Sequence, residues 1–186
     1  MSRDNTQYWD ESLKKGEYWV SRVTIATDRF IQKNNLKPTK PKLIPFITEK
    51  DKKTQKNGID AVVNTLYNIE VKTRYDLRYY NRDIALETVS VIETGKKGWI
   101  YTSKADFISY VWATSKELMP IGYIIDVEAF RKTNIYKKIE TYPKIKAYSE
   151  TWSTRGHTIP IYKFPEKTLY RFNPNDIPKT DISNWG

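Results

Sequence analysis

The feature that most constrains the fold is the sequence GIDAVVNTLYNIEVKT at residues 58–73. Two runs of mainly apolar and β-branched residues, 59–63 and 67–73, are separated by a short polar segment at 64–66. Runs of this length, broken by a turn segment, are typical of two paired β-strands. We therefore expect a β-hairpin here, with its register set by a three-residue turn.

The predicted hairpin carries charged residues in the middle of its strands. Glu70 and Lys72 alternate with Ile69 and Val71, so the two charged side chains share one side of the second strand. A three-residue turn also places Asp60 directly across from Glu70. Carboxylates opposite one another on a sheet repel, and burial would add a desolvation cost. A divalent cation removes both penalties, and Mg²⁺ is typically bound by carboxylates, water and substrate phosphates.

Two interpretations of these charges are open at this point. In the first, Asp60 and Glu70 hold Mg²⁺, and Lys72 contacts a phosphate or the attacking water. In the second, the three side chains lie on a solvated hairpin face and form a cross-strand ion pair. The pattern acidic–any–Lys also occurs at Asp51, in a lysine-rich segment, so the tripeptide alone does not separate the two.

The composition narrows the class of protein. The 186 residues include 32 Lys and Arg against 22 Asp and Glu, a net charge of +10, which suits a polyanionic partner such as DNA. A lysine-rich coding style would give the same excess. There is no cysteine, and His157 is the only histidine, which excludes disulfides and thiolate-rich or histidine-rich metal sites. No apolar run approaches the roughly 20 residues of a membrane helix, so we expect a cytoplasmic protein with no membrane partner.

The rest of the chain predicts an α/β (α+β) domain. We expect a helix at 12–35, a helix at 127–139 capped by Asp126, and strands at 42–48, 83–93, 99–103, 106–114, 121–126, 158–164 and 168–172. Residues 106–114 could also form a short helix. We expect a single domain over 1–186, in which 141–186 is a loosely organised C-terminal arm.

The segment Gly58-Ile59-Asp60, followed by Ile69-Glu70-Val71-Lys72, resembles the core motif of the PD-(D/E)XK nuclease superfamily, which includes restriction endonucleases and Holliday-junction resolvases. The resemblance covers roughly residues 12–112. One departure is that Ile59 stands where the superfamily motif has proline. The resemblance implies a restriction-endonuclease-like core, in which helices flank a central mixed β-sheet.

The same resemblance implies roles for individual residues. Asp60 and Glu70 would be metal ligands, the Val71 carbonyl would face the metal, and Lys72 would be the catalytic lysine. Glu17 would be the further glutamate that the first helix of the superfamily often carries. An acidic residue near a helix N-terminus is also favoured electrostatically, which is the other interpretation of Glu17. The implied cofactor is Mg²⁺, for which Mn²⁺ can substitute.

Basic residues that follow the hairpin are candidates for nucleic-acid binding. They are Arg74, Arg78, Arg82, Lys96, Lys97 and Lys104. The three arginines are interleaved with Tyr75, Tyr79 and Tyr80, an arrangement that suits phosphate contacts with base stacking. A solvated helix or loop face would look the same. Glu87 could extend the active face or pair with Arg82 or Lys72, or it could lie on an exposed strand face.

These observations predict a Mg²⁺-dependent deoxyribonuclease, a hydrolase of DNA phosphodiester bonds that we expect to be an endonuclease. The alternative is a catalytically inactive basic module on the same fold that binds nucleic acid or protein. RNA as the substrate, exonucleolytic cutting and a homodimer all stay open. No glycine-rich phosphate loop or Gly-x-Ser-x-Gly elbow is present in the sequence, which argues against nucleotide-triphosphate hydrolysis and acyl transfer.

Overall fold

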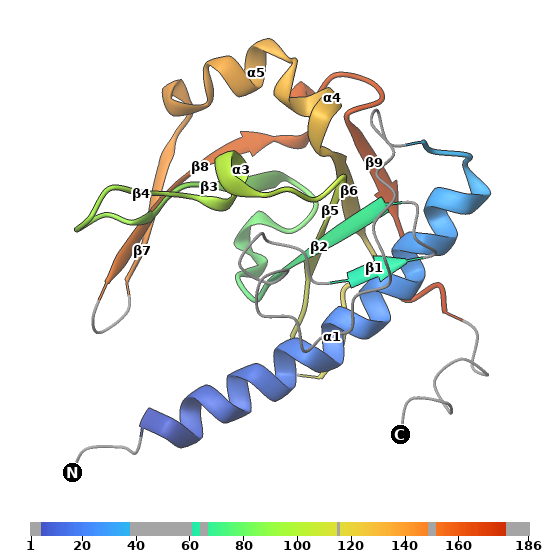
Figure 1. Ribbon diagram of the computed structural model, residues 1–186, viewed down its shortest axis with the longest axis horizontal. Helices are drawn as coiled ribbons and strands as arrows, with labels where there is room; N and C mark the ends of the chain where they lie inside the picture. The colour runs from blue at the N-terminus through green and yellow to red at the C-terminus, as the bar shows by residue number, and fades with distance from the viewer. Residues whose placement is uncertain (1–4, 38–60, 64–66, 115, 149–151, 178–186) are drawn as a thin grey trace.

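Two β-sheets and one long helix dominate the structure, a computed structural model that describes residues 5–37, 61–63, 67–114, 116–148 and 152–177 (Figure 1). Side chains are described from residue 19 onward, except in 61–63. The mixed α+β class predicted from the sequence is confirmed. The second sheet and several short helices were not predicted.

The first sheet is mixed. It contains, in spatial order, β1 (Ala61–Val63), β2 (Tyr67–Arg74), β5 (Phe107–Trp112), β6 (Gly122–Asp126) and β9 (Leu169–Phe172). β2 and β5 are parallel, and the other neighbours are antiparallel. The predicted hairpin is confirmed as β1 and β2, and the strands expected at 106–114, 121–126 and 168–172 are also present.

The second sheet is antiparallel throughout. Its spatial order is β4 (Lys96–Lys97), β3 (Asp83–Val91), β8 (Ser153–Pro160) and β7 (Lys144–Tyr148). β7, β8 and β9 all lie within 141–186, so this region differs from the loosely organised arm that we expected. The sequence pattern did not reveal β7 because it is an edge strand whose side chains are mostly exposed. The strand expected at 42–48 lies outside the described residues.

The helices are α1 (Asn5–Lys33), α3 (Trp99–Thr102), α4 (Val127–Arg131) and α5 (Asn134–Lys137), with 3-10 turns η1 (Leu77–Tyr79), η2 (Ile139–Thr141) and η3 (Ile161–Lys163). The Asp126 carboxylate accepts a hydrogen bond from the Ala129 N–H, which confirms the predicted cap. The helix expected at 127–139 is interrupted, because Thr133 caps α5 separately by accepting from the Tyr136 N–H.

The strand predicted at 99–103 is wrong, because these residues form the single turn α3. Aromatic and β-branched residues favour a strand, but packing overrides that preference here. Gly98 lies against β3 so closely that an added Cβ would be 2.3 Å from the Glu87 carbonyl oxygen. The chain therefore turns at Gly98. Trp99 and Ile100 are then buried in the same core as the β3 side chains.

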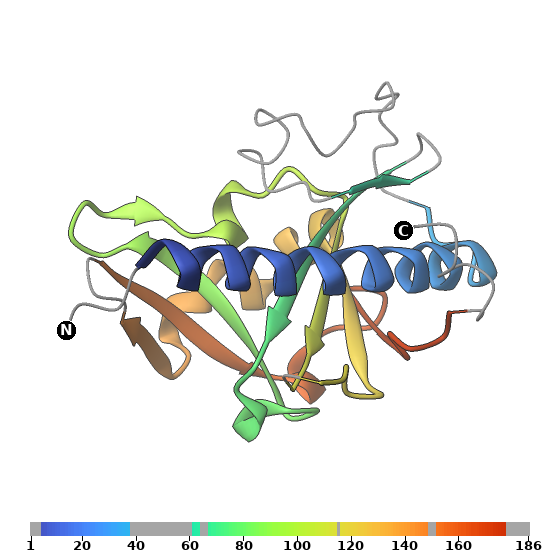
Figure 2. The same cartoon turned by 90° about the horizontal axis from the view of Figure 1, so that it is seen from below.

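α1 crosses the strands of the first sheet and covers one of its faces (Figure 2). The apolar side chains in this layer include Trp19, Val23, Ala26 and Ile31 from α1 and Ile69, Val71, Phe107, Val111 and Ile124 from the sheet. Polar contacts also join the layers: the hydroxyls of Thr27 and Ser109 lie 2.7 Å apart, and the Tyr67 hydroxyl donates a hydrogen bond to the Asp28 carboxylate. We call this side of the sheet the α1 face.

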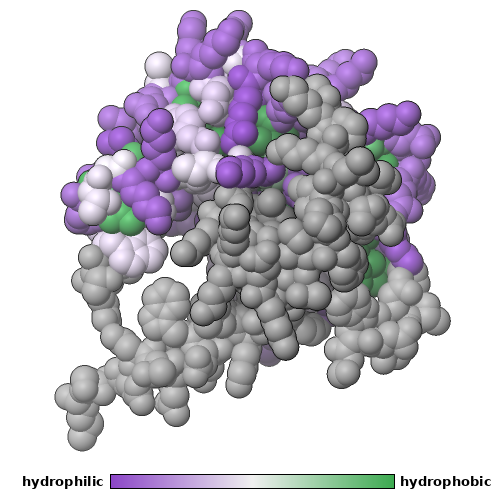
Figure 3. Space-filling model, viewed as in Figure 1, coloured by the Kyte–Doolittle hydropathy of each residue, from purple (hydrophilic) through white to green (hydrophobic). Residues whose placement is uncertain are grey.

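The opposite side of the same sheet, the inner face, packs against the second sheet and the short helices. Ile108, Tyr110, Trp112 and Ile125 of the first sheet join Ile84, Leu86, Ile100 and Phe130 in this core. On the face seen in Figure 3, the coloured residues are largely hydrophilic, with apolar residues in small separate areas. Within the described part of the chain, no helix has the length and apolar character that crossing a bilayer requires.

Candidate active site

The charged side chains of β2 belong to the inner face. Glu70 pairs in register with Ile108, and Lys72 pairs with Tyr110, both of which belong to the inner core. Ile69 and Val71 point the other way, into the α1 face. The alternation predicted from the sequence is therefore present, and it directs both charges toward the second sheet.

Glu70 is buried, with 1% of its surface exposed, and one carboxylate oxygen forms an ion pair with the Lys72 ammonium. The Lys72 side chain retains 25% exposure, and its Nζ lies 5.4 Å from the centre of the Trp99 ring. Burial of a carboxylate–ammonium pair seldom stabilises a fold, since desolvation offsets the attraction. The burial of Glu70 argues against the solvated hairpin face considered above.

The hairpin register bears on the predicted partner of Glu70. Ala61 pairs with Ile69 and Val63 with Tyr67, which leaves three residues in the turn, as expected. The described pairing ends at Ala61, one residue after Asp60, so the predicted pair of Asp60 and Glu70 would be the next in the same register. Asp60 itself lies outside the described residues, so its position and its role as a metal ligand stay predictions.

Two further predicted ligands are also untested. Glu17 lies within α1, but its side chain lies outside those described. The described part of α1 packs on the face of β2 opposite Glu70. Val71 is buried with its side chain on the α1 face, and nothing in these contacts tests the role predicted for its carbonyl.

The described residues include no group of three or more His, Asp and Glu side chains close enough to hold a metal. They do supply one buried carboxylate, Glu70, whose hard oxygens are of the kind that Mg²⁺ prefers. A carboxylate is thus a suitable type of ligand for Mg²⁺. The site would have two carboxylate ligands if Asp60 takes the predicted position.

Trp99 connects Lys72 to Glu87, and sequence reasoning did not select it. Its ring lies under the Lys72 ammonium, and its backbone N–H donates to the Glu87 carboxylate at 3.4 Å. Glu87 is half-buried on β3 rather than exposed. Neither predicted ion pair of Glu87 is present, since Lys72 contacts Glu70 and Arg82 contacts Asp83. In the sequence, Trp99 is marked only by its position directly after Gly98. That position could not be used, because the close packing of Gly98 is visible only in three dimensions.

The three predicted arginines lie at and beyond the C-terminal end of β2, in contact with tyrosine rings. The Arg74 Nε–H donates to the Tyr110 hydroxyl at 3.2 Å, and its guanidinium lies 5.4 Å from that ring's centre. Arg78 and Arg82 both lie within 6 Å of the Tyr79 ring. The interleaved pattern therefore produces arginine–tyrosine contacts.

Arg78 is also held by a carboxylate. Its guanidinium donates to both oxygens of Asp76, and this hydrogen bonding holds the pKa of Asp76 below its ordinary value. Arg82 likewise contacts Asp83 at 3.0 Å. No carboxylate contacts Arg74 among the described residues, so Arg74 is the member of the group with the most capacity for an external anion.

The predicted lysines lie apart from the arginines. Lys96 and Lys97 are exposed on β4, which pairs with Val89 and Val91 at the far end of β3 from Arg82. Eight residues of extended strand correspond to roughly 25 Å, so the two positive regions are well separated. Lys104 is exposed between α3 and β5.

Comparison of the chain with protein-family models, with curated proteins and with solved structures finds no match.

Proposed function

We propose that the protein is a Mg²⁺-dependent DNA endonuclease with a catalytic centre of PD-(D/E)XK type on β2. The observation that carries this proposal is the burial of Glu70 beside Lys72 in the inner face of a mixed sheet. A buried ion pair of this kind is often no better for stability than apolar residues of similar volume, so the stability of the fold does not by itself call for a carboxylate here. Metal binding provides a functional reason.

The residues divide the chemistry between them. Glu70 and the predicted Asp60 would hold the metal, which when bound lowers the pKa of a coordinated water and stabilises charge on the scissile phosphate. The Lys72 ammonium contacts an anion and the face of an aromatic ring, both of which attract positive charge. Lys72 therefore acts as a cation that orients the nucleophile or the phosphate, rather than as a general base.

The arginines at the end of β2 support a polyanionic substrate. Arg74 is on the same side of β2 as Glu70 and Lys72, two residues further along the strand. Two residues of strand span about 7 Å, so a phosphate at Arg74 would be close to one at Lys72. The net charge of +10 adds a sequence-independent attraction for DNA that weakens with salt.

A second candidate is a basic binding module without catalysis. The observation in its favour is that Lys72 itself pairs with Glu70, and the described residues include no group of three or more acidic or histidine side chains that could hold a metal. Such a module would bind DNA through the arginines and lysines alone.

Nicking of supercoiled plasmid with Mg²⁺ or Mn²⁺ separates the two candidates. The nuclease proposal predicts that wild type cuts, that EDTA abolishes cutting, and that Glu70→Gln slows it by about 100-fold or more. Glu117→Gln is the control, because it makes the same chemical change at an exposed residue that belongs to neither β2 nor the predicted site. Equal cutting by wild type and Glu70→Gln would place the activity elsewhere. Salt-dependent binding with no cutting by either protein would favour the binding module.

A further inference from the structure

A cavity of about 290 Å³ opens beside the candidate active site, between the two sheets. β2 and β5 of the first sheet form one side, and β3, β7 and β8 of the second sheet form the other. Sites for small organic ligands typically measure about 300–1,000 Å³, so this cavity is of the size for one compact group.

The aromatic side of the cavity is rigid. Tyr110 and Trp112 are fully buried, and their rings meet edge to face with centres 5.0 Å apart. The Tyr110 hydroxyl accepts hydrogen bonds from the Ala85 N–H on β3 and from Arg74 on β2, which ties the sheets together at this point. Tyr79 adds a third ring from η1. Tyr110 and Trp112 support this side from within the core, whereas Tyr79 is only half-buried and is the ring with open surface. Bases stack on open aromatic rings of this kind in single-strand binding proteins.

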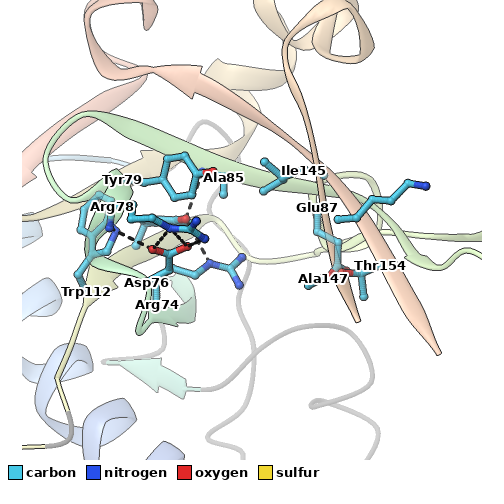
Figure 4. A pocket seen from close by; sticks show the side chains of 13 residues that line it. Arg74, Asp76, Arg78, Tyr79, Ala85, Glu87, Trp112, Ile145, Ala147 and Thr154 are labelled. Atoms are coloured by element: carbon cyan, nitrogen blue, oxygen red, sulfur yellow. Dashed lines mark hydrogen bonds and ion pairs between the residues drawn. The ribbon is translucent and has the colours of Figure 1, made fainter. Parts of the chain in front are cut away.

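The cavity also carries charged side chains: Arg74 and Arg78, Glu87, and Lys146 of β7. Figure 4 shows Arg74, Arg78 and Trp112 toward one end and Glu87, Ala147 and Thr154 toward the other. At the cationic end, Arg78 is neutralised by Asp76, whereas Arg74 has no carboxylate partner among the described residues. At the opposite end, the Glu87 carboxylate can accept a hydrogen bond from an amino group.

The cavity and the candidate active site share structural elements. Arg74 lies two residues beyond Lys72 on the same side of β2, and Trp99 contacts both Lys72 and Glu87. A group held in the cavity by its phosphate at Arg74 would therefore be the immediate neighbour of a phosphate at Lys72.

We propose that this cavity binds one unpaired nucleotide of the DNA strand, next to the phosphate that is cut. Its base enters between the sheets against the aromatic side, its amino group meets Glu87, and its phosphate contacts Arg74. A paired base cannot enter, because it would have to leave the stack first. The inference rests on the proposed function for its choice of DNA as the ligand, and it adds a preference for substrates that contain an unpaired position.

Fluorescence anisotropy tests this inference in EDTA, where cleavage plays no part. Two labelled duplexes are compared, identical except that one carries a single unpaired adenine, whose amino group can donate to Glu87. We expect wild type to bind the bulged duplex about 10-fold more tightly. Ala147→Trp fills the cavity from the exposed strand β7 and should reduce the preference to less than about 2-fold, with Ala147→Leu between the two.

Asn134→Trp, on exposed α5, is the matched control and should keep the wild-type preference. Equal affinity of wild type for both duplexes, or an unchanged preference in Ala147→Trp, would overturn the inference. Because the assay needs no metal, a failure of the plasmid assay leaves its outcome intact. Plasmid nicking by a protein that shows no preference for the bulge would refute the cavity's role and leave the nuclease proposal standing.

Discussion

The two faces of the first sheet are both buried, yet they contain different kinds of residue. On the α1 face, the strands contribute Ile69, Val71, Phe107, Val111 and Ile124, and the contacts are almost entirely apolar. On the inner face, the same strand β2 contributes Glu70, Lys72 and Arg74 to a layer that also contains buried aromatic rings. β2 therefore contributes apolar side chains to the α1 face, and on the inner face it holds charged side chains whose burial costs desolvation free energy.

The difference indicates which positions the fold needs and which it merely accommodates. The apolar contacts of Ile69 stabilise the sheet by removing surface from water. The buried Glu70 is poorly explained by stability, since an apolar residue of similar volume is often as good or better in such a position. Substitutions at neighbouring positions of β2 can therefore separate stability from activity.

The largest effect on stability is expected for Ile69→Ala on the α1 face. Ile69 is fully buried, so the truncation should lower the free energy of unfolding by about 2–5 kcal/mol. Urea denaturation measures the loss. Ile69→Val, which removes one methyl group, should cost about 1 kcal/mol. A loss at Ile69→Ala below that of Ile69→Val would show that α1 does not pack as described.

Gly98→Ala should have the next largest effect, on the inner face. An added Cβ would lie 2.3 Å from the Glu87 carbonyl oxygen and 2.8 Å from the Thr88 carbonyl carbon, so α3 must move away from β3. We expect a loss of about 3 kcal/mol in thermal or urea unfolding. Gly95→Asn is the control, because Gly95 has a φ of +68° with open space around it, and asparagine tolerates that conformation. Equal stability of Gly98→Ala and wild type would contradict the packing of α3.

Lys72→Met tests the buried charge directly. Removal of the ammonium takes away a cation beside a buried carboxylate, which we expect to lower the free energy of unfolding by about 1–2 kcal/mol, less than for a fully buried pair because Lys72 is partly exposed. The double variant Glu70→Gln/Lys72→Met should recover at least half of the loss. No recovery in the double variant would mean that the two side chains do not act as a pair.

Asp126 is a second buried carboxylate of the same sheet, and it provides a smaller, structural contrast to Glu70. Burial raises the pKa of Asp126 above its ordinary 3.8. The folded state then holds the proton more tightly than the unfolded state, so stability should fall as pH rises from 3.8 through the raised pKa. Asp126→Asn should remove this contribution to the pH dependence. Thermal unfolding of wild type and Asp126→Asn across pH 3–6 measures it, and the sign is read from the difference between the two proteins, because a carboxylate with a lowered pKa such as Asp76 contributes the opposite slope to both. A difference of opposite sign would contradict the assignment.

Local patterns predicted the elements that depend on local sequence. Alternation identified β2 and β3, and the cap at Asp126 follows from its position before an apolar helix. The second sheet depends on long-range pairing, such as that of Asp83 with Pro160, which leaves no local signal. The same limit applies to the site. The alternation of Glu70 and Lys72 was visible in the sequence, whereas their burial and the contact with Trp99 arise only when the second sheet and α3 cover the inner face.

Calorimetric titration with Mn²⁺ tests most directly whether the buried Glu70 carboxylate binds a metal ion or only pairs with Lys72. Wild type should bind Mn²⁺, and Glu70→Gln should bind at least about 10-fold more weakly because a charged oxygen ligand is lost. Lys72→Met should bind as tightly as wild type or tighter, since the ammonium no longer competes for the carboxylate. Equal Mn²⁺ affinity in wild type and Glu70→Gln, or no binding by wild type and Lys72→Met, would contradict the metal site.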